Sequence, residues 1–213
     1  LFVCEGDSAI GGLRSARDKL HQGGIALKGK PMNVSQATLK DIMDNEEFAD
    51  IMASVGLVLG QPVDFEDLRY SKIVFLADSD VDGGHINTLL INFFYTFWPE
   101  LFDKGMIQLA KAPLFEIITD KGERIYAESE SELEKMKKTT KIKEIQRNKG
   151  LGEMSPEAFK HVMSRVEYTK ITTVNAQAAK DILNVCFGRD TNLRKDLLID
   201  NSDISVERKK KSA

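Results

Sequence analysis

One stretch near the middle of the chain restricts the possible folds more than any other. The apolar run from Lys72 to Ala77 is typical of a buried strand, and it ends in the acidic turn 78–84. An apolar helix is expected from His85 to about Phe102, and a second apolar strand from Met106 to Ala110. A strand, a helix and a strand in this order form a βαβ unit, which requires parallel strands. The sequence therefore predicts an α/β fold that binds its ligand at the carboxyl ends of the strands.

The remaining segments extend this pattern and then change it. Leu1 to Cys4 is expected to be a short buried strand, followed by a turn and a helix over residues 9–20. Beyond Pro113, residues 115–127 alternate around a turn at 120–122, which predicts a hairpin. Helices are expected to begin near Ser35, Asn45, Ser129 and Ser155, and a last one to cover 177–187. The second half is therefore expected to be helical and polar, and to pack on the first.

Composition and charge exclude several classes of protein. A hydrophobic fraction of 42% with 30% charged residues is typical of a soluble domain and unlike a disordered or membrane protein. The net charge of −3 argues against a free-standing DNA-binding module with a broad basic face, so a nucleic-acid role would depend on local basic groups or metal ions. Cys4 and Cys186 lie in apolar sequence and are expected to be reduced core thiols of an intracellular protein.

The acidic turn carries three carboxylates, Asp78, Asp80 and Asp82. Alternate side chains of an extended segment share a face, so these three are expected to converge. Unpaired, they would raise one another's pKa, and a divalent cation would relieve that repulsion. Oxygen ligands favour Mg²⁺ or Ca²⁺ over Zn²⁺.

The acidic turn has two other interpretations. An EF-hand calcium loop also opens with alternating aspartates, but it needs a preceding helix and a glutamate at its twelfth position, where this chain has Leu89. The second alternative is a solvated acidic turn without chemistry. Glu5 argues against it, because it is an acid at the end of another strand and is followed by small residues that let a phosphate approach. One acid on one strand and three on its neighbour suit metal-assisted phosphoryl transfer, in which one carboxylate moves a proton.

Four motifs in order resemble the TOPRIM domain of gyrase B and topoisomerase IV B subunits, which are type IIA DNA topoisomerases. They are Glu5-Gly6-Asp7-Ser8-Ala9, Leu27-Lys28-Gly29-Lys30 with Asn33-Val34, the Asp78 turn with Gly83-Gly84-His85-Ile86, and Gln146-Arg147-Asn148-Lys149-Gly150-Leu151-Gly152-Glu153-Met154. The resemblance runs from Glu5 to about Leu197. TOPRIM primases and recombination proteins share the acids but lack the Lys-Gly-Lys and Lys-Gly-Leu-Gly-Glu-Met segments.

The resemblance implies a Rossmann-like TOPRIM fold with a parallel central sheet and a helical tail. A metal-binding core is expected over residues 1–125, and a helical tail with the Lys-Gly-Leu-Gly-Glu-Met segment over residues 126–213. The chain departs from the family at Gly84 and Asn87, and at Asn148, where the family has tyrosine. Residues 93–105 are nearer to the large subunits of T-even-type phages, which implies a phage source.

The resemblance also assigns roles to individual residues. Glu5 would be the general acid and base at the scissile 3′ oxygen and would bind metal together with Asp78, Asp80 and Asp82. Four basic residues would contact DNA phosphates, although plain surface charge is the alternative for each: Lys28, Lys30, Arg147 and Lys149. His85 either touches the site or simply lies in the first helical turn.

The implied enzyme needs parts that this chain lacks. Type IIA cleavage uses a tyrosine that becomes joined to the DNA 5′ end, and none of Tyr70, Tyr95, Tyr126 and Tyr168 is a credible nucleophile. The expected partners are double-stranded DNA, a tyrosine-bearing subunit and an ATPase region that would bind ATP, with one or two Mg²⁺ ions as cofactor and the cytoplasm of a bacterial or phage-infected cell as location. A TOPRIM-type metal-dependent nuclease and a scaffold with vestigial acids are the alternatives.

Overall fold

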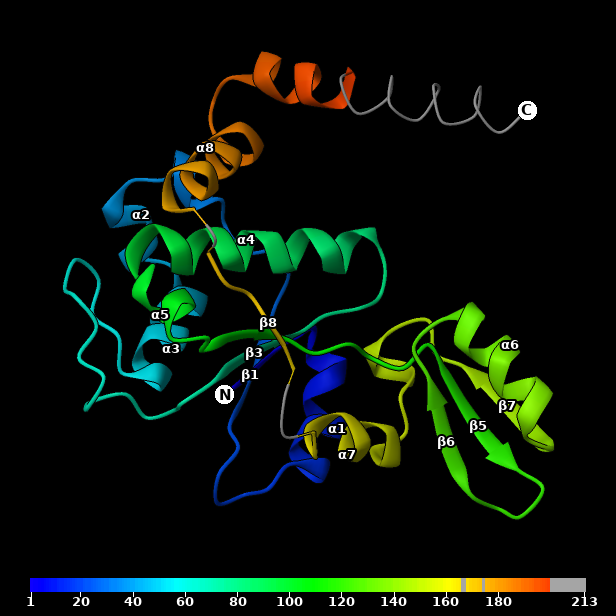
Figure 1. Cartoon of the computed structure of the whole chain (residues 1–213). Coiled ribbons are helices and arrows are strands. Elements are labelled where there is room, and N and C mark those ends of the chain that lie inside the picture. Colours follow the sequence, from blue (N-terminus) through cyan, green and yellow to red (C-terminus); the bar gives the residue numbers. More distant parts are fainter. Residues whose placement is uncertain (166–167, 174, 200–213) are drawn as a thin grey trace.

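A five-stranded sheet forms the centre of the computed structural model, which describes residues 1–165, 168–173 and 175–199 (Figure 1). Its strands lie in the order β2-β1-β3-β4-β8. Their bounds are Phe2–Glu5 (β1), Gly24–Leu27 (β2), Ile73–Leu76 (β3), Ile107–Leu109 (β4) and Thr169–Lys170 (β8). The first four strands are parallel, and β8 pairs antiparallel with β4. The predicted α/β class and βαβ unit are confirmed.

Alternation along the central strands produces two apolar faces. Val3 and Phe75 belong to one core cluster, and Cys4 and Leu76 belong to the other, as successive side chains of a strand must. Figure 1 shows α3 (Glu46–Val55), α4 (Val81–Phe97) and α5 (Glu100–Asp103) on the first face, and α1 (Asp7–Ala16) and α7 (Pro156–Met163) on the second. The sheet is thus buried on both sides, which fits its continuous apolar strands.

Side-chain caps set most helix boundaries. Asn45 accepts a hydrogen bond from the Phe48 amide at the start of α3, and Gly56 ends that helix with φ 92°. Ser35 is not a cap, contrary to expectation: Asn33 precedes the short 3₁₀ helix η1 (Val34–Gln36), and a further helix, α2 (Leu39–Met43), is capped by Thr38. The Thr38 and Asp41 side chains cap each other's backbone reciprocally, which provides a stronger start signal than Ser35 has.

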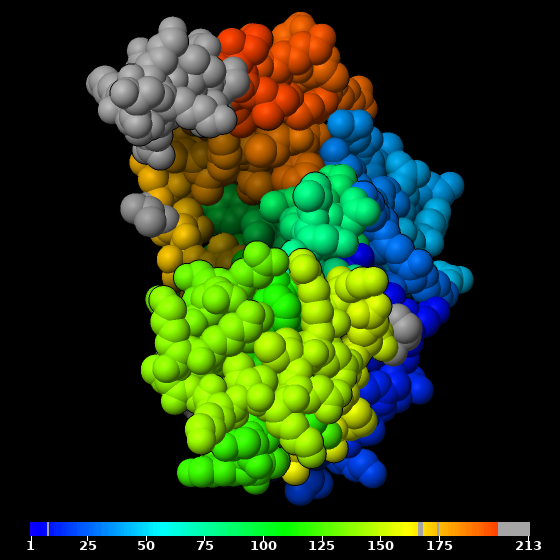
Figure 2. Space-filling model, turned by 90° about the vertical axis from the view of Figure 1, so that its right-hand side faces the viewer, coloured from blue at the N-terminus to red at the C-terminus, as the bar shows by residue number. Residues whose placement is uncertain are grey.

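A smaller unit lies to one side of the central sheet (Figure 1). It consists of the antiparallel sheet β6-β5-β7 and helix α6 around a small core of its own, with bounds Phe115–Thr119 (β5), Arg124–Ala127 (β6), Glu130–Thr139 (α6) and Ile142–Arg147 (β7). In Figure 2 its green-to-yellow atoms fill the lower half of the face shown, below the orange atoms of α8 (Ala176–Phe187).

The expected division into a core over 1–125 and a helical tail over 126–213 stays a prediction, and this unit lies across its boundary. The boundary at residue 125 falls inside strand β6, and the second part contributes strands β7 and β8 besides its helices. Strand β5 lies before residue 125 and pairs with both β6 and β7, so one sheet contains residues from both sides of that boundary. Helices in the second part include α8 and residues 191–199, whereas residues 200–213 lie outside the described part of the chain.

Helix α8 packs over α4 rather than standing apart. Leu183 and Ala179 lie against the main core, and the Asn33 side chain donates a hydrogen bond to the Phe187 carbonyl at 2.9 Å. Within the described residues, no helix combines the length and apolar character needed to cross a membrane.

The two cysteines are expected to react very differently. Cys4 is fully buried in β1, and burial raises the pKa of its thiol to about 12, whereas Cys186 is exposed on α8, contrary to the expectation of a core thiol. The thiolate is the reactive form, so an alkylating reagent at about pH 8 should modify Cys186 and leave Cys4 intact in the folded chain. Mass spectrometry of the labelled protein measures this; rapid labelling of Cys4 under native conditions would contradict the packing of β1.

Candidate metal centre

Two acids from distant parts of the sequence meet at the carboxyl ends of β1 and β3. Glu5 is the last residue of β1, and Asp78 follows the end of β3 by two residues. The two strands are parallel neighbours, so their ends lie side by side. The Asp78 backbone amide donates a hydrogen bond to Glu5 Oε2 at 3.1 Å, which fixes the Glu5 carboxylate against the acidic turn.

The later signature segment reaches the same point. The Leu151 amide, in the 3₁₀ helix η2 (Leu151–Glu153), donates a hydrogen bond to Asp78 Oδ1 at 2.7 Å. Gly150 lies so close to Asp78 that a Cβ at this position would be 2.6 Å from Asp78 Oδ2. Three of the four motifs, far apart in the sequence, are therefore in contact through Asp78.

Substituting Gly150 by alanine should displace the Asp78 carboxylate. The backbone of Gly150 has φ −160°, which alanine adopts freely, so the effect would come from the clash alone. We expect a loss of about 1–3 kcal/mol in the free energy of unfolding, measured by urea denaturation. Gly11→Ala is the matched control, because nothing lies within 4 Å of the added Cβ in α1, and it should be neutral or mildly stabilising. Equal stabilities of the two variants would contradict the close approach.

The start of helix α4 corrects the expected geometry of the other two aspartates. The helix begins at Val81 rather than His85, so Asp80 is its N-cap and accepts a hydrogen bond from the Gly83 amide at 2.8 Å. Asp82 lies in the first helical turn, where it pairs with Lys30 at 2.7 Å. The alternation of an extended segment therefore ends at Asp80, and the inference that all three carboxylates share one strand face is wrong.

Electrostatics distinguishes the acids. Burial, followed by the negative charges of Asp78, Asp80 and Asp82, raises the pKa of Glu5 above its ordinary value, although the hydrogen bond from the Asp78 amide acts in the opposite direction. The Lys30 ammonium lowers the pKa of Asp82 through its hydrogen bond and its charge. Glu5 thus lies in a net negative field, whereas Asp82 has a cation paired with it.

The donor chemistry at these strand ends fits a hard divalent cation. The ligands on offer are carboxylate oxygens, and Glu5 and Asp80 each use only one oxygen in the hydrogen bonds described above. Among the described residues, however, no three histidine, cysteine, aspartate or glutamate side chains converge closely enough to hold one ion. The Asp80 side chain caps α4 through the Gly83 amide, and Asp82 pairs with Lys30. Binding an ion would therefore require these side chains to reorient.

The four basic residues expected to contact DNA are distributed around the acids. Lys28 and Lys30 follow β2, whose last residue Leu27 is in register with Glu5. The Lys28 ammonium lies 3.4 Å from a carboxylate oxygen of Glu46. Arg147 ends β7, lies 3.5 Å from Glu130 and covers the Phe115 ring. Lys149 is exposed next to Gly150. All four positions are accessible, with three of them in surface ion pairs that water screens.

His85 stays a possible site residue, because its charge helps to lower the pKa of Asp82, whereas Tyr168 and Tyr95 are unsuited to nucleophilic attack. His85 is exposed in the first turns of α4, on the helix that Asp80 caps. Tyr168 donates its hydroxyl to the Val162 carbonyl, and burial raises its pKa to about 12, so it is a poor nucleophile. Tyr95 is buried and donates to the Ala176 carbonyl.

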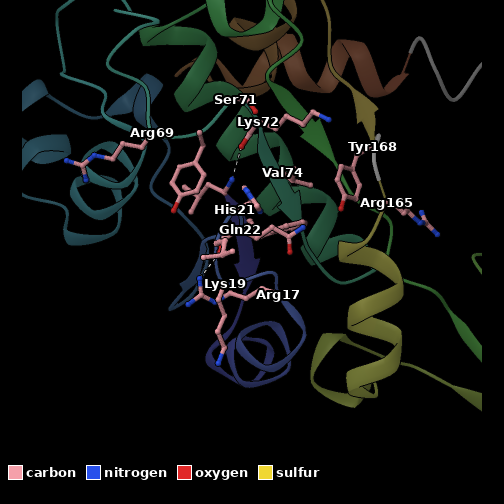
Figure 3. Close-up of a pocket in the computed structure, with 14 residues that line it drawn as sticks. Arg17, Lys19, His21, Gln22, Arg69, Ser71, Lys72, Val74, Arg165 and Tyr168 are labelled. Carbon is pink, nitrogen blue, oxygen red and sulfur yellow. Dashed lines mark hydrogen bonds between the residues drawn. The ribbon is translucent and has the colours of Figure 1, made fainter.

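A cleft lies at the opposite, amino ends of β1 and β3 (Figure 3). It has a volume of about 610 Å³ and a basic lining that includes Arg17, Lys19, His21, Arg69 and Arg165. In Figure 3 the ends of Arg69, Arg165 and Lys19 point in different directions, so they do not converge on one small anion. Ligands of such sheets bind at the carboxyl ends, where the acids lie.

Sequence reasoning missed one contact of the centre and one buried carboxylate outside it. The contact of the Leu151 amide with Asp78 carries no side-chain signal, although the segment containing it matches a family motif. The buried carboxylate of Glu116, which holds that segment, lies in an alternating strand and looks like an exposed residue in the sequence.

The fold and its site define the class of protein: an α/β domain with carboxylates at the carboxyl ends of two adjacent parallel strands. The Toprim domain family matches residues 1–114, just over half of the 213 residues, and the chain belongs to this family. Toprim domains of type II topoisomerases bind metal ions, generally Mg²⁺.

The relatives with the most similar sequences include two bacterial topoisomerase proteins. The DNA gyrase B protein of Thermotoga maritima is 36% identical over 203 residues, which cover 93% of this chain and 32% of that protein. The DNA topoisomerase 4 B protein of Mycoplasma capricolum is 36% identical over 211 residues, covering 97% of this chain and 33% of that protein. The chain thus spans about a third of the length of these relatives.

A solved structure has the same fold. The DNA-binding, cleavage and re-ligation domain of Plasmodium falciparum topoisomerase II matches with a TM-score of 0.76 and 28% sequence identity. The match covers 92% of this chain and 28% of that chain. It therefore extends well beyond the Toprim core of residues 1–114.

Proposed function

We propose that this chain is the metal-binding portion of a type IIA DNA topoisomerase that cleaves and religates double-stranded DNA. The observation that carries the proposal is the meeting of Glu5, Asp78 and Leu151, which joins three distant motifs at one edge of the sheet. The sequence similarity to the B proteins of gyrase and topoisomerase 4 supports it. The tyrosine nucleophile would come from a partner subunit, and ATP would bind to a region outside this chain.

Glu5 would act as the general acid and base. In cleavage the partner's tyrosine would lose its hydroxyl proton to solvent as its oxygen attacks phosphorus, the bond to the 3′ oxygen would break, and Glu5 would give its proton to that leaving oxygen. In religation Glu5 would take the proton from the attacking 3′ hydroxyl, and the tyrosine oxygen would regain one from solvent. A raised pKa suits this role, because it lets Glu5 hold a proton closer to neutral pH. Bound Mg²⁺ would neutralise the phosphate and stabilise the leaving oxygen.

The remaining residues would hold the ion and the DNA. Asp78 and Asp80 are the proposed ligands of the catalytic ion, and Asp82 would help to bind a second one after releasing Lys30. Lys28, Lys30, Arg147 and Lys149 would contact backbone phosphates. Action in the cytoplasm is part of the proposal, and the similarity of residues 93–105 to phage subunits stays a prediction.

Plasmid cleavage with Mg²⁺ tests the function. The chain is assayed with and without the tyrosine-bearing subunit, in the presence of the ATPase region and ATP, for wild type and Asp78→Ala. Partner-dependent cleavage with protein on the 5′ ends, lost in Asp78→Ala, is the expected result. Asp50→Ala is the control, because Asp50 is exposed on α3. Nicks made by this chain alone would indicate a nuclease, and full activity of Asp78→Ala would indicate a scaffold with vestigial acids.

A further inference from the structure

One carboxylate outside the metal centre, that of Glu116, is almost completely buried. Glu116 lies on β5 in the smaller unit, and only 3% of it is exposed. Burying a charge is costly unless hydrogen-bond donors surround it. A carboxylate in such a position therefore needs a structural reason, and its neighbours supply one.

The hydrogen-bond donors to Glu116 come from the signature segment and the residue that follows it. Oε1 accepts hydrogen bonds from Asn148 Nδ2 at 3.2 Å and from the Ser155 amide at 3.0 Å. Oε2 accepts from Ser155 Oγ at 2.6 Å. Arg124 on β6 lies farther away, at 3.7 Å, and supplies a positive charge. Charge-assisted bonds of this kind are shorter and stronger than neutral ones.

The two residues that Glu116 binds lie at the two ends of one loop, formed by residues 149–154. The middle of that loop carries the Leu151 amide, which donates to Asp78, and Gly150, which lies against the same carboxylate. Within the loop, the Lys149 amide donates to the Glu153 side chain at 2.9 Å. A single carboxylate thus closes the loop at both ends, and the loop in turn fixes Asp78.

Asn148 has a second anchor that sets its orientation. Its Nδ2 also donates to the Pro113 carbonyl at 3.1 Å, so both partners of this nitrogen are acceptors. The Asn148 backbone amide donates to the Leu114 carbonyl at 2.9 Å, just before β5. The first end of the loop is therefore tied to β5 through both its side chain and its backbone.

We propose that Glu116 is a positioning residue for Asp78, acting through Asn148, Ser155 and the loop between them. It does not touch the reacting atoms. Removing the carboxylate would take away one hydrogen bond of Asn148 and two of Ser155, so both ends of the loop would be held less firmly. The Leu151 amide would then be held less firmly on Asp78. The inference rests on the proposed function only in taking Asp78 to be a metal ligand.

Amide hydrogen exchange of the metal-free chain tests the positioning role directly. In Glu116→Ala, the amides of residues 149–154 should exchange at least about tenfold faster, whereas those of Ile117 and Ile145 in the β5–β7 pair should change little. Glu116→Gln should restore most of the protection, because its oxygen still accepts from Asn148 and Ser155. Glu144→Gln, an exposed position on β7, is the control and should behave as wild type.

Metal affinity provides the second readout. Mn²⁺ binding, measured by titration calorimetry, should weaken about tenfold in Glu116→Ala, as is usual when the support of a metal ligand is removed.

Unchanged amide exchange in residues 149–154 would overturn the proposal. An equal rise in exchange across the whole β6-β5-β7 sheet would also overturn it, because Glu116 would then be a purely structural residue. Should Glu116→Ala fail to fold, Asn148→Ala opens one end of the loop and makes the same selective prediction. Failure of the proposed function would instead appear in Asp78→Ala cleavage, with the exchange result unaffected.

Discussion

Replacing Glu5 by glutamine should slow DNA cleavage by about 10²–10⁴-fold, the usual contribution of a general acid or base. Glutamine keeps the shape of the side chain and can still accept the Asp78 amide hydrogen bond, but it cannot deliver a proton. The measurement is the rate of cleavage in the presence of the tyrosine-bearing subunit, at saturating Mg²⁺. Glu144→Gln removes the same charge at an exposed site and should leave the rate unchanged.

The pH dependence makes the Glu5 prediction sharper. A raised carboxyl pKa means that the folded chain holds a proton that the unfolded chain has released. In the metal-free protein, the stabilising contribution of protonated Glu5 is therefore lost as the pH rises from the ordinary carboxyl pKa of 4.5 through the raised pKa of the folded chain. Glu5→Gln should remove this pH dependence of the free energy of unfolding. A variant that cleaves as fast as wild type, with the same pH profile, would exclude Glu5 as the proton carrier.

Replacing Phe93 by alanine should have the largest effect on stability, a loss of about 3–5 kcal/mol in the free energy of unfolding. The ring is fully buried on α4 and stacks on Phe48 of α3, with centroids 4.1 Å apart and an interplanar angle of 7°. It also makes edge contacts with Phe94, Phe97 and Trp98. Truncation leaves a cavity that these large rings cannot fill. Urea denaturation of the isolated chain measures the loss.

Phe65→Ala is the matched control for Phe93. Phe65 is 41% exposed, and its ring contact is with the Lys104 ammonium at 5.6 Å. Removing this ring should lower the free energy of unfolding by about 1 kcal/mol or less. Similar losses in the two variants would show that the aromatic cluster of α4 is not the centre of the main core.

The elements that sequence reasoning predicted well are those with strong local signals. The apolar run of β3, the βαβ unit and the caps at Asn45, Ser129 and Ser155 depend on residues close together in the chain, and each was confirmed. The hairpin around residues 120–122 was also confirmed as β5 and β6. Such features need no knowledge of the tertiary structure, because the local pattern determines them.

The features that were wrong or missed depend on long-range contacts. Asp82 was placed with Asp78 because the strand was expected to continue, whereas Asp80 caps a helix that begins one residue later. Cys186 lies in apolar sequence but on the open side of α8. Glu116 alternates with apolar residues as an outward position would, and only the return of the chain at Asn148 and Ser155 buries it. The site residues themselves stay predictions until they are tested.

The late strand β8 and helix α7 have a consequence for making shorter pieces of this protein. The family match ends at residue 114, yet α7 covers the α1 face of the sheet and β8 occupies the outer edge of β4. A truncation at residue 114 would leave apolar side chains such as Leu13 and Leu76 uncovered and expose the unpaired backbone of β4. Exposed edges of this kind recruit other strands, so such a fragment would aggregate, and soluble expression requires the chain to extend at least through Lys170.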